Sequence, residues 1–120
     1  MEQAQESFTI SDEKARLQPE RIFALLASSY WADARSRETI LKSIENSLCF
    51  GAYDENGEQI GFARCVTGYA TMFWMADVIV DERFRGRGVG KALATAAVRH
   101  ERLRGLATGR RGLQIERGAG

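Results

Sequence analysis

The sequence predicts one mixed α/β domain, with a mainly antiparallel sheet and helices on its faces. Three observations predict this class. Apolar residues recur at helical spacing in three segments, β-branched and aromatic runs lie between those segments, and an Asn-Gly pair separates two of the runs. The chain has 120 residues, 44% of them apolar, which suits a single domain with a modest core.

The first third of the chain predicts a short strand and two helices. Residues 7–10 have strand character. Pro19 suits the first turn of a helix, where its missing N–H costs nothing, and apolar residues follow it at helical spacing up to Tyr30. Ser36 is a good N-cap for a second helix, with Glu38 in the first turn. The apolar stripe of that second helix is Ile40, Leu41, Ile44 and Leu48.

The middle of the chain predicts a hairpin and a further strand. Residues 48–53 and 59–67 are apolar runs on either side of Asn56-Gly57, the dipeptide most typical of a tight hairpin. Residues 72–80 form a third apolar run, which ends in three β-branched residues and therefore favours a strand.

A basic, glycine-rich loop joins this strand to a third helix. The loop reads Arg85-Gly86-Arg87-Gly88-Val89-Gly90-Lys91, and helical spacing of apolar residues begins within it. Glycines let the backbone approach a ligand, and the first N–H groups of a helix have no partner inside the helix. With the positive end of the helix dipole and three basic side chains, such a loop forms a cradle for a diphosphate.

The spacing of the glycines decides between the known phosphate-binding motifs. A Walker A loop needs glycine at position 85 and a hydroxyl residue at position 92, where the chain has Arg85 and Ala92. A dinucleotide fingerprint needs glycine at position 91, where the chain has Lys91. The pattern that fits is RxxGxG, satisfied by Arg85, Gly88 and Gly90. With this pattern between a strand and a helix, the sequence resembles the GNAT superfamily of N-acetyltransferases.

The resemblance covers roughly residues 6–108 and implies an acetyl-CoA site without a metal. In the family, the RxxGxG loop follows the fourth strand, opens the third helix and holds the pyrophosphate of coenzyme A. The backbone at the end of that strand pairs with the pantetheine arm. The residues that the resemblance assigns to coenzyme binding are Val78, Ile79, Val80, Arg85, Gly86, Arg87, Gly88, Val89, Gly90 and Lys91.

The resemblance also implies catalytic groups, because family members transfer acetyl to an amine by direct attack. A carboxylate or a water chain takes the proton of the amine, and a backbone N–H of the splayed fourth strand polarises the carbonyl. Asp77 is the candidate carboxylate, with the alternative that it is a structural partner of Arg64 or of a loop N–H. Tyr30 and Trp31 follow the first helix, where the family builds acceptor pockets, and alternatively they are core or surface aromatics.

Other reactive side chains are weaker candidates. Tyr69 lies in the connection before the fourth strand. His100 lies on the apolar stripe of the third helix, which favours a packed or helix-capping histidine over a catalytic one. Cys49 and Cys65 lie in apolar runs outside any CxxC pair, which favours buried, reduced thiols and excludes a zinc site of the usual ligand spacing.

The C-terminal part departs from the family pattern. Residues 105–108 favour a short last strand, so we expect an acetyl-CoA-binding domain over residues 1–108 and a divergent tail over residues 109–120. Relatives continue with a helix that carries a tyrosine and with a closing hairpin, whereas no tyrosine follows Tyr69 in this chain. The fold is therefore expected to lack that helix and hairpin. We expect either a homodimer that covers the open sheet edge or a chain shortened by a changed reading frame.

Two functional hypotheses follow from these features. The first is an N-acetyltransferase that moves acetyl from acetyl-CoA to a primary amine of a small molecule or peptide. The alternative is a catalytically impaired coenzyme A-binding or interaction protein derived from the same family. The N-terminus is polar and no apolar run is long enough to span a bilayer, so we expect a soluble cytoplasmic protein.

The charge distribution favours a local anion site over a nucleic-acid surface. The formal net charge is +1, with about −6 over residues 1–81 and about +7 over residues 82–120. The basic residues of the second segment have a single aromatic, Phe84, among them, and the total charge is near zero, so nucleic-acid binding fits less well. The arginines concerned are Arg83, Arg85, Arg87, Arg99, Arg102 and Arg104.

Overall fold

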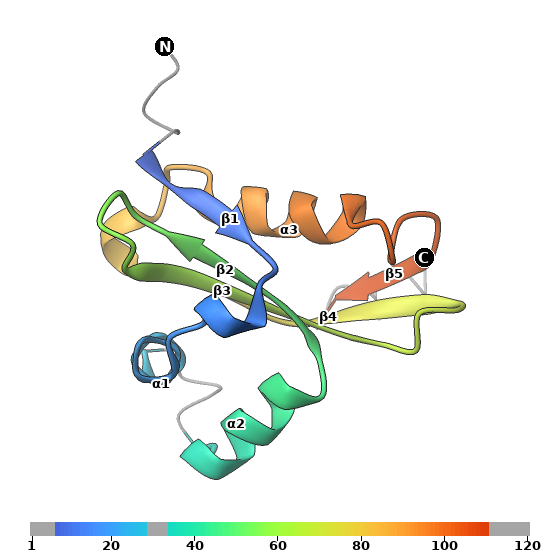
Figure 1. The fold of residues 1–120 in the computed structure, drawn as a ribbon, viewed down its shortest axis with the longest axis horizontal. Coiled ribbons are helices and arrows are strands. Elements are labelled where there is room, and N and C mark those ends of the chain that lie inside the picture. The colour runs from blue at the N-terminus through green and yellow to red at the C-terminus, as the bar shows by residue number, and fades with distance from the viewer. Residues whose placement is uncertain (1–6, 29–33, 111–120) are drawn as a thin grey trace.

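The chain folds into a five-stranded sheet between two layers of helix (Figure 1). The structure, a computed structural model, describes residues 7–28 and 34–110. The strands are β1 (Thr9–Ser11), β2 (Leu48–Tyr53), β3 (Gln59–Thr67), β4 (Met72–Val80) and β5 (Ala107–Arg110). The helices are α1 (Pro19–Ala27), α2 (Arg37–Glu45) and α3 (Val89–Arg99), with 3-10 turns η2 (Lys14–Arg16) and η3 (Glu82–Phe84).

The sheet follows the order of the chain and is mainly antiparallel, which confirms the predicted fold class. Strands β1 to β4 are antiparallel to their neighbours, and β5 runs parallel to β4 after the α3 crossover. The pairing of β4 with β5 covers only the four residues from Met72 to Met75. Among the described residues, the second half of β4 therefore has no strand on that side.

Several local sequence signals act as predicted. Pro19 is the first residue of α1, and the Ser36 hydroxyl accepts a hydrogen bond from the Thr39 N–H, at 3.1 Å, as the cap of α2. Gly57 has a φ of 83° in the hairpin between β2 and β3. The Asp54 carboxylate accepts the N–H groups of two residues in this hairpin.

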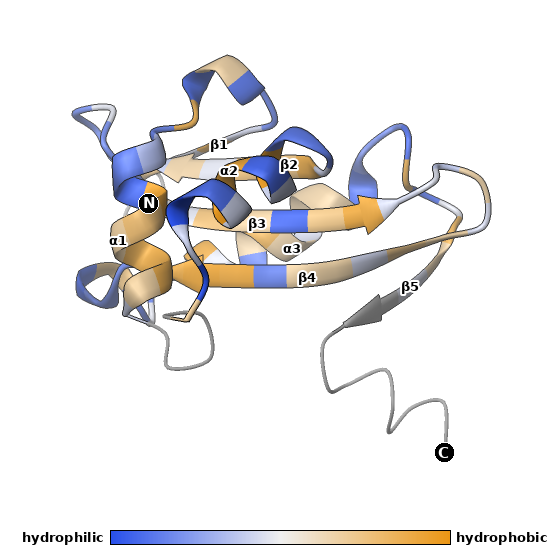
Figure 2. Cartoon of the chain, turned by 90° about the horizontal axis from the view of Figure 1, so that it is seen from below, coloured by the Kyte–Doolittle hydropathy of each residue, from blue (hydrophilic) through white to orange (hydrophobic). Residues whose placement is uncertain are grey.

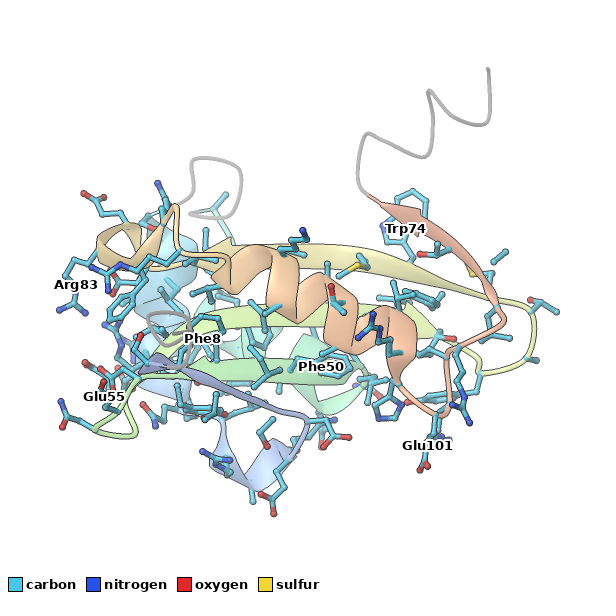
Figure 3. All side chains as sticks on the ribbon, turned by 90° about the horizontal axis from the view of Figure 1, so that it is seen from above. Phe8, Phe50, Glu55, Trp74, Arg83 and Glu101 are labelled. Carbon is cyan, nitrogen blue, oxygen red and sulfur yellow. The ribbon has the colours of Figure 1, made fainter. Side chains whose placement is uncertain are left out.

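Two packed clusters hold the helices on opposite faces of the sheet. The first cluster lies under α3 and joins it to β2, β3 and β4 through buried residues that include Phe50, Phe73 and Leu93. The second joins α1 and α2 to the other face through residues that include Ile22 and Ile44. Figure 3, which views the molecule from the α3 side, shows Phe50 beneath that helix. No helix in the described ranges is long and apolar enough to cross a membrane.

A close approach fixes the first turns of α3 on the sheet. Gly61 of β3 lies under this helix, and a Cβ placed on it would come within 3.2 Å of Ala52, Val89 and Leu93. The absence of a side chain at Gly61 lets the helix pack directly on the strand. This contact positions the beginning of α3, where the glycine-rich loop enters the helix.

A β-bulge divides β4 into two halves that face different layers. Arg64 of β3 pairs with Asp77 and the next residue of β3 pairs with Met75, so Ala76 is an extra residue in β4. Before the bulge, Met75 packs under α3, whereas after it the odd-numbered Ile79 packs against α1 and α2. The bulge lies where the pairing of β4 with β5 ends.

Some expectations differ from the structure at the element ends. The predicted apolar stripe of the second helix is buried at Ile40 and Ile44, but Leu41 is exposed and Leu48 belongs to β2, because the helix ends at Glu45. The last strand begins at Ala107, two residues later than predicted. The left-handed Gly105 precedes that strand, which explains the later start.

Candidate functional site

The glycine-rich loop adopts the open conformation that its sequence predicts. Gly86 and Gly88 have φ values of 83° and 85°, a region that L side chains avoid. Gly88 is the N-cap of α3, and the first helical hydrogen bond runs from the Ala92 N–H to its carbonyl, at 2.9 Å. The N–H groups of Val89, Gly90 and Lys91 therefore have no helical partner and remain able to bind an anion.

A cavity of about 460 Å³ lies between this loop and the end of β4. It brings together the predicted strand end and loop, with two differences. Phe84 of η3 joins the lining, and Arg87 does not belong to it. The cavity is lined by Val78, Ile79, Val80, Phe84, Arg85, Gly86, Gly88, Val89, Gly90 and Lys91. Phe84 is the one aromatic residue in a charged stretch of the sequence, and this contrast is the sequence signal that marks it as a candidate for the site.

The backbone of β4 directs groups that are not bonded to β3 along the same cavity. The Asp81 N–H donates to the Ile60 carbonyl at 2.8 Å, so in the antiparallel ladder the neighbouring Val80 directs its N–H and C=O away from β3. By the same alternation, Val78 also directs its backbone groups to the open side. The Nε of Arg85 donates to the Val80 carbonyl at 3.2 Å, which ties the loop to this edge. The edge can therefore pair with an extended, amide-containing ligand.

The basic residues of the loop have different environments. Arg85 and Lys91 line the cavity, whereas the Arg87 guanidinium lies 5.2 Å from the centre of the Phe84 ring. Arg83 binds the Asp81 carboxylate through its Nε and Nη2, at 3.1 and 2.9 Å. Figure 3 shows Arg83 at the outer edge of the molecule, beside the turn that precedes α3. Positive charge at the cavity itself therefore comes from two of these four side chains.

Asp81 connects the loop to α1. Its carboxylate accepts the backbone N–H of Arg83, at 2.9 Å, and a hydrogen bond from Nη2 of Arg21 in α1, at 2.8 Å. The hydrogen bonds from Arg83, supported by Arg21, hold the pKa of the Asp81 carboxyl well below its usual range although burial opposes them. The Nε of Arg21 also donates to the Gln59 carbonyl at 3.0 Å. The start of the loop is thus fixed to α1 and β3, a network that the sequence did not indicate.

Asp77 lies on the α1 and α2 face, in contact with two arginines. Its side chain is 1% exposed. One carboxylate oxygen accepts a hydrogen bond from Nε of Arg64 at 2.7 Å, and Arg35 approaches both oxygens at 3.3 and 3.4 Å. Figure 2 shows the hydrophilic bands in the middle of β3 and β4 side by side among apolar neighbours. These contacts match the alternative in which Asp77 is a structural partner of Arg64.

The other candidates lie apart from the glycine-rich loop or outside the described residues. Tyr30 and Trp31 fall in the segment 29–33, outside the described residues. Tyr69 has a φ of 63° in the connection between β3 and β4, with the Arg102 guanidinium 3.6 Å from its ring centre. Figure 1 places that connection at the end of the sheet opposite to the start of α3.

His100 and the cysteines have structural environments. His100 is the C-cap of α3, and its Nε2 lies 2.8 Å from a carboxylate oxygen of Asp12. Its Nδ1 accepts the Arg102 N–H at 3.1 Å, and its backbone N–H donates to the Ala97 carbonyl at 3.2 Å, which caps the helix end. Burial raises the pKa of the Cys49 thiol to about 11 and that of Cys65 to about 12, which disfavours the nucleophilic thiolates.

A second cavity, of about 350 Å³, opens between α1 and α2. It is lined by Glu20, Phe23, Ala24, Ala27, Arg35, Arg37 and Ile40. Because Arg35 also contacts Asp77 of β4, this cavity adjoins the strand that lines the first one. The sequence did not indicate Arg35, which stands in a polar stretch just before the cap of α2.

The fold and site together form a cavity between a glycine-rich helix start and an open strand edge, a shape that suits a phosphate-bearing, extended ligand. The model of the Acetyltransferase (GNAT) family matches residues 15–111. The chain therefore belongs to the GNAT acetyltransferase family.

Individual relatives agree with this assignment. A protein from Xanthomonas campestris pv. campestris, assigned to the GNAT family, superposes with a TM-score of 0.81 at 31% identity, over 93% of this chain and 80% of that one. A protein of Gibberella zeae, assigned as an acetyltransferase, is 27% identical over 70% of this chain, which spans 58% of that relative. An N-acetyltransferase from Thermoplasma acidophilum, solved with coenzyme A, shares the fold at 16% identity and a TM-score of 0.58, over 76% of this chain and 69% of that one.

Proposed function

We propose that the protein binds acetyl-CoA in the 460 Å³ cavity and transfers its acetyl group to a primary amine. The observation that carries the proposal is the open helix start: three N–H groups without helical partners lie beside Arg85 and Lys91. The coenzyme A bound to the Thermoplasma relative supports the same ligand class for this fold. Here the pyrophosphate would accept hydrogen bonds from Val89, Gly90 and Lys91.

The open edge of β4 suits the rest of the coenzyme. The pantetheine arm contains two amides, and Val80 and Val78 present backbone groups on the side away from β3. We assign the Val78 N–H, two residues after the bulged Ala76, to the thioester carbonyl. A hydrogen bond to that oxygen stabilises the negative charge that develops on it in the transition state.

The reaction needs a neutral amine and a proton for the leaving sulfur. The amine nitrogen forms a bond to the carbonyl carbon and loses a proton, the carbon–sulfur bond breaks, and the leaving thiolate takes up a proton. Both oxygens of Asp77 already contact guanidinium groups, so we assign it to positioning Arg64 and Arg35 rather than to proton transfer. The assignment of Tyr30 as a catalytic group stays a prediction.

Calorimetric titration with acetyl-CoA tests the binding step. We expect a dissociation constant in the micromolar range, about −8 kcal/mol. Arg85→Ala removes a charge from the cavity and the bond to Val80, so we expect binding about tenfold weaker, the value of one charge-assisted hydrogen bond. Arg104→Ala, at an exposed arginine outside the cavity, is the matched control. Equal affinities for the two variants would contradict the assignment.

A thiol-release assay with acetyl-CoA and a panel of primary amines tests the transfer step. Amine-dependent release of the coenzyme thiol supports the enzyme. Tight binding without release from any amine would instead support the alternative, a coenzyme A-binding protein without transferase activity.

We also propose a homodimer, in the soluble cytoplasm, through the sheet edge at β5. Among the described residues, β5 pairs only with β4, which leaves its other edge open. Three apolar side chains nearby, Val66, Tyr69 and Met72, are more than a third exposed. Sedimentation equilibrium checks the state of assembly, and a folded monomer at all concentrations would refute the dimer.

A further inference from the structure

The cavity between α1 and α2 has apolar walls and three charged side chains. Its apolar walls come from Phe23, Ala24, Ala27 and Ile40. Its charged lining comes from Glu20, Arg37 and Arg35. The Glu20 carboxylate lies 3.2 Å from Nη1 of Arg37, so the one acidic residue of the described lining already forms a salt bridge. The acidic excess of the N-terminal two thirds therefore does not gather in this cavity.

We propose that the acceptor amine carries a carboxylate a few bonds away, and that Arg35 binds this carboxylate. The inference rests on the proposed function, because it names the acceptor of the same reaction. A planar guanidinium donates two parallel hydrogen bonds to a carboxylate, which gives both orientation and affinity. An amino-acid-like acceptor fits this description, whereas a polyamine would bring a second cation beside Arg35.

The contacts of Asp77 show how Arg35 can serve a ligand. Arg64 lies 2.7 Å from this carboxylate, the distance of a strong charge-assisted hydrogen bond. Arg35 lies at 3.3 and 3.4 Å from the same group, and its side chain is 23% exposed. Arg64 is thus the tighter partner of Asp77. A ligand carboxylate that contacts Arg35 would therefore leave the bond between Asp77 and Arg64 in place.

The position of Arg35 relative to β4 supports this role. Its partner Asp77 lies between the bulged Ala76 and Val78, the residue whose N–H we assign to the thioester carbonyl. A carboxylate held by Arg35 would therefore place its amine close to the open edge of β4. A guanidinium nearby also disfavours the protonated form of the amine, because like charges repel. The same residue would thus orient the acceptor and favour its reactive, neutral form.

Matched acceptors test the inference. The assay compares several amino acids with their carboxamides and their decarboxylated amines, with rates normalised to the concentration of unprotonated amine. We expect kcat/KM for the free acids to exceed that for the other two forms by at least about tenfold, the value of one charge-assisted hydrogen bond. Arg35→Gln should remove this preference, and Arg35→Lys should retain part of it. Arg104→Gln, outside both cavities, should leave it unchanged.

Binding readouts separate this inference from the proposed function. Calorimetry with acetyl-CoA shows whether Arg35→Gln remains folded, since the coenzyme cavity does not include that residue. Saturation-transfer NMR with N-acetyl amino acids and their carboxamides measures product recognition without turnover, and tighter binding of the acids supports the inference. Carboxamides that react and bind as well as the acids would overturn it and leave acetyl transfer intact. An Arg35→Gln variant that lowers kcat/KM equally for all acceptors would also overturn the inference.

Discussion

The left-handed conformation of Gly88 gives a prediction with a calculable size. Gly88 caps α3 at φ 85° and ψ 8°, and a Cβ placed on it would meet nothing within 4 Å. The cost of Gly88→Ala is therefore conformational rather than steric, about 1–2 kcal/mol for an L residue in this region. If the loop keeps its shape, the cost lowers the free energy of unfolding, and Tm falls by about 4–8 °C per kcal/mol.

The same cost can appear in ligand binding instead. If the loop of the alanine variant relaxes in the free protein, it must return to the left-handed conformation to bind acetyl-CoA. Binding is then about 5–30-fold weaker. We therefore expect the loss in unfolding free energy and the loss in binding free energy to add to about 1–2 kcal/mol. Chemical denaturation measures the first quantity, and calorimetric titration with acetyl-CoA measures the second.

Two further variants serve as controls. Gly88→Asn should cost less than Gly88→Ala, because asparagine tolerates the left-handed region better. Gly88→Val should cost more, because β-branching restricts the backbone further. An alanine variant with unchanged stability and unchanged affinity would refute the reasoning. An asparagine variant as damaged as the alanine variant would refute it as well.

Three other predictions address packing, pH and thiol reactivity. Gly61→Ala should lower the free energy of unfolding by about 1–3 kcal/mol, because the added methyl group crowds α3, and a urea titration with an unchanged midpoint would contradict this. The pKa of Asp81 is lower in the folded chain than its unfolded value of about 3.9, so its carboxylate stabilises the fold above that pH and loses this effect as the pH falls. Asp81→Asn should therefore lower the free energy of unfolding by about 1 kcal/mol at pH 7, a value that is small because solvent surrounds Arg83, and by less at pH 3. Denaturation experiments that give the same difference between wild type and variant at both pH values would argue against this account. Burial keeps the Cys49 and Cys65 thiols protonated at pH 8, so an aromatic disulfide reagent should label them only on unfolding, and rapid labelling of the native protein would be inconsistent with the structure.

The parts of the fold that the sequence predicts depend on local physical chemistry. Pro19 and Ser36 mark helix starts because a missing N–H or a capping hydroxyl acts within one turn. Gly57 marks the hairpin because positive φ is a property of the single residue. The sequence places Leu48 in both the helical stripe and the following strand, because an apolar residue at the boundary fits either pattern, and the structure assigns it to β2.

The candidate site likewise has parts that depend on the local sequence and parts that depend on how distant residues pack. The loop from Arg85 to Lys91 is contiguous, so the residues that the resemblance assigns to it include most of the lining of the 460 Å³ cavity. The contact of Arg35 with Asp77 joins residues 42 positions apart, and the bond of Arg21 to Asp81 spans 60 positions. Such contacts depend on how the helices pack on the sheet, which a local pattern does not encode. The sequence therefore predicts the lining at the glycine-rich loop better than the contacts between the helices and the sheet.

The extra residue in β4 has a consequence for how this strand tolerates change. Because Ala76 reverses which layer the odd-numbered side chains meet, the strand behaves as two segments with opposite phase. Deleting that one residue would restore a regular alternation and leave the Asp77 carboxylate on the α1 and α2 face, because Met75 and Asp77 already pair with consecutive residues of β3. A substitution chosen by counting alternate residues along β4 would accordingly put a polar or apolar side chain on the intended face on one side of position 76. On the other side of that position, the same counting would put it on the opposite face.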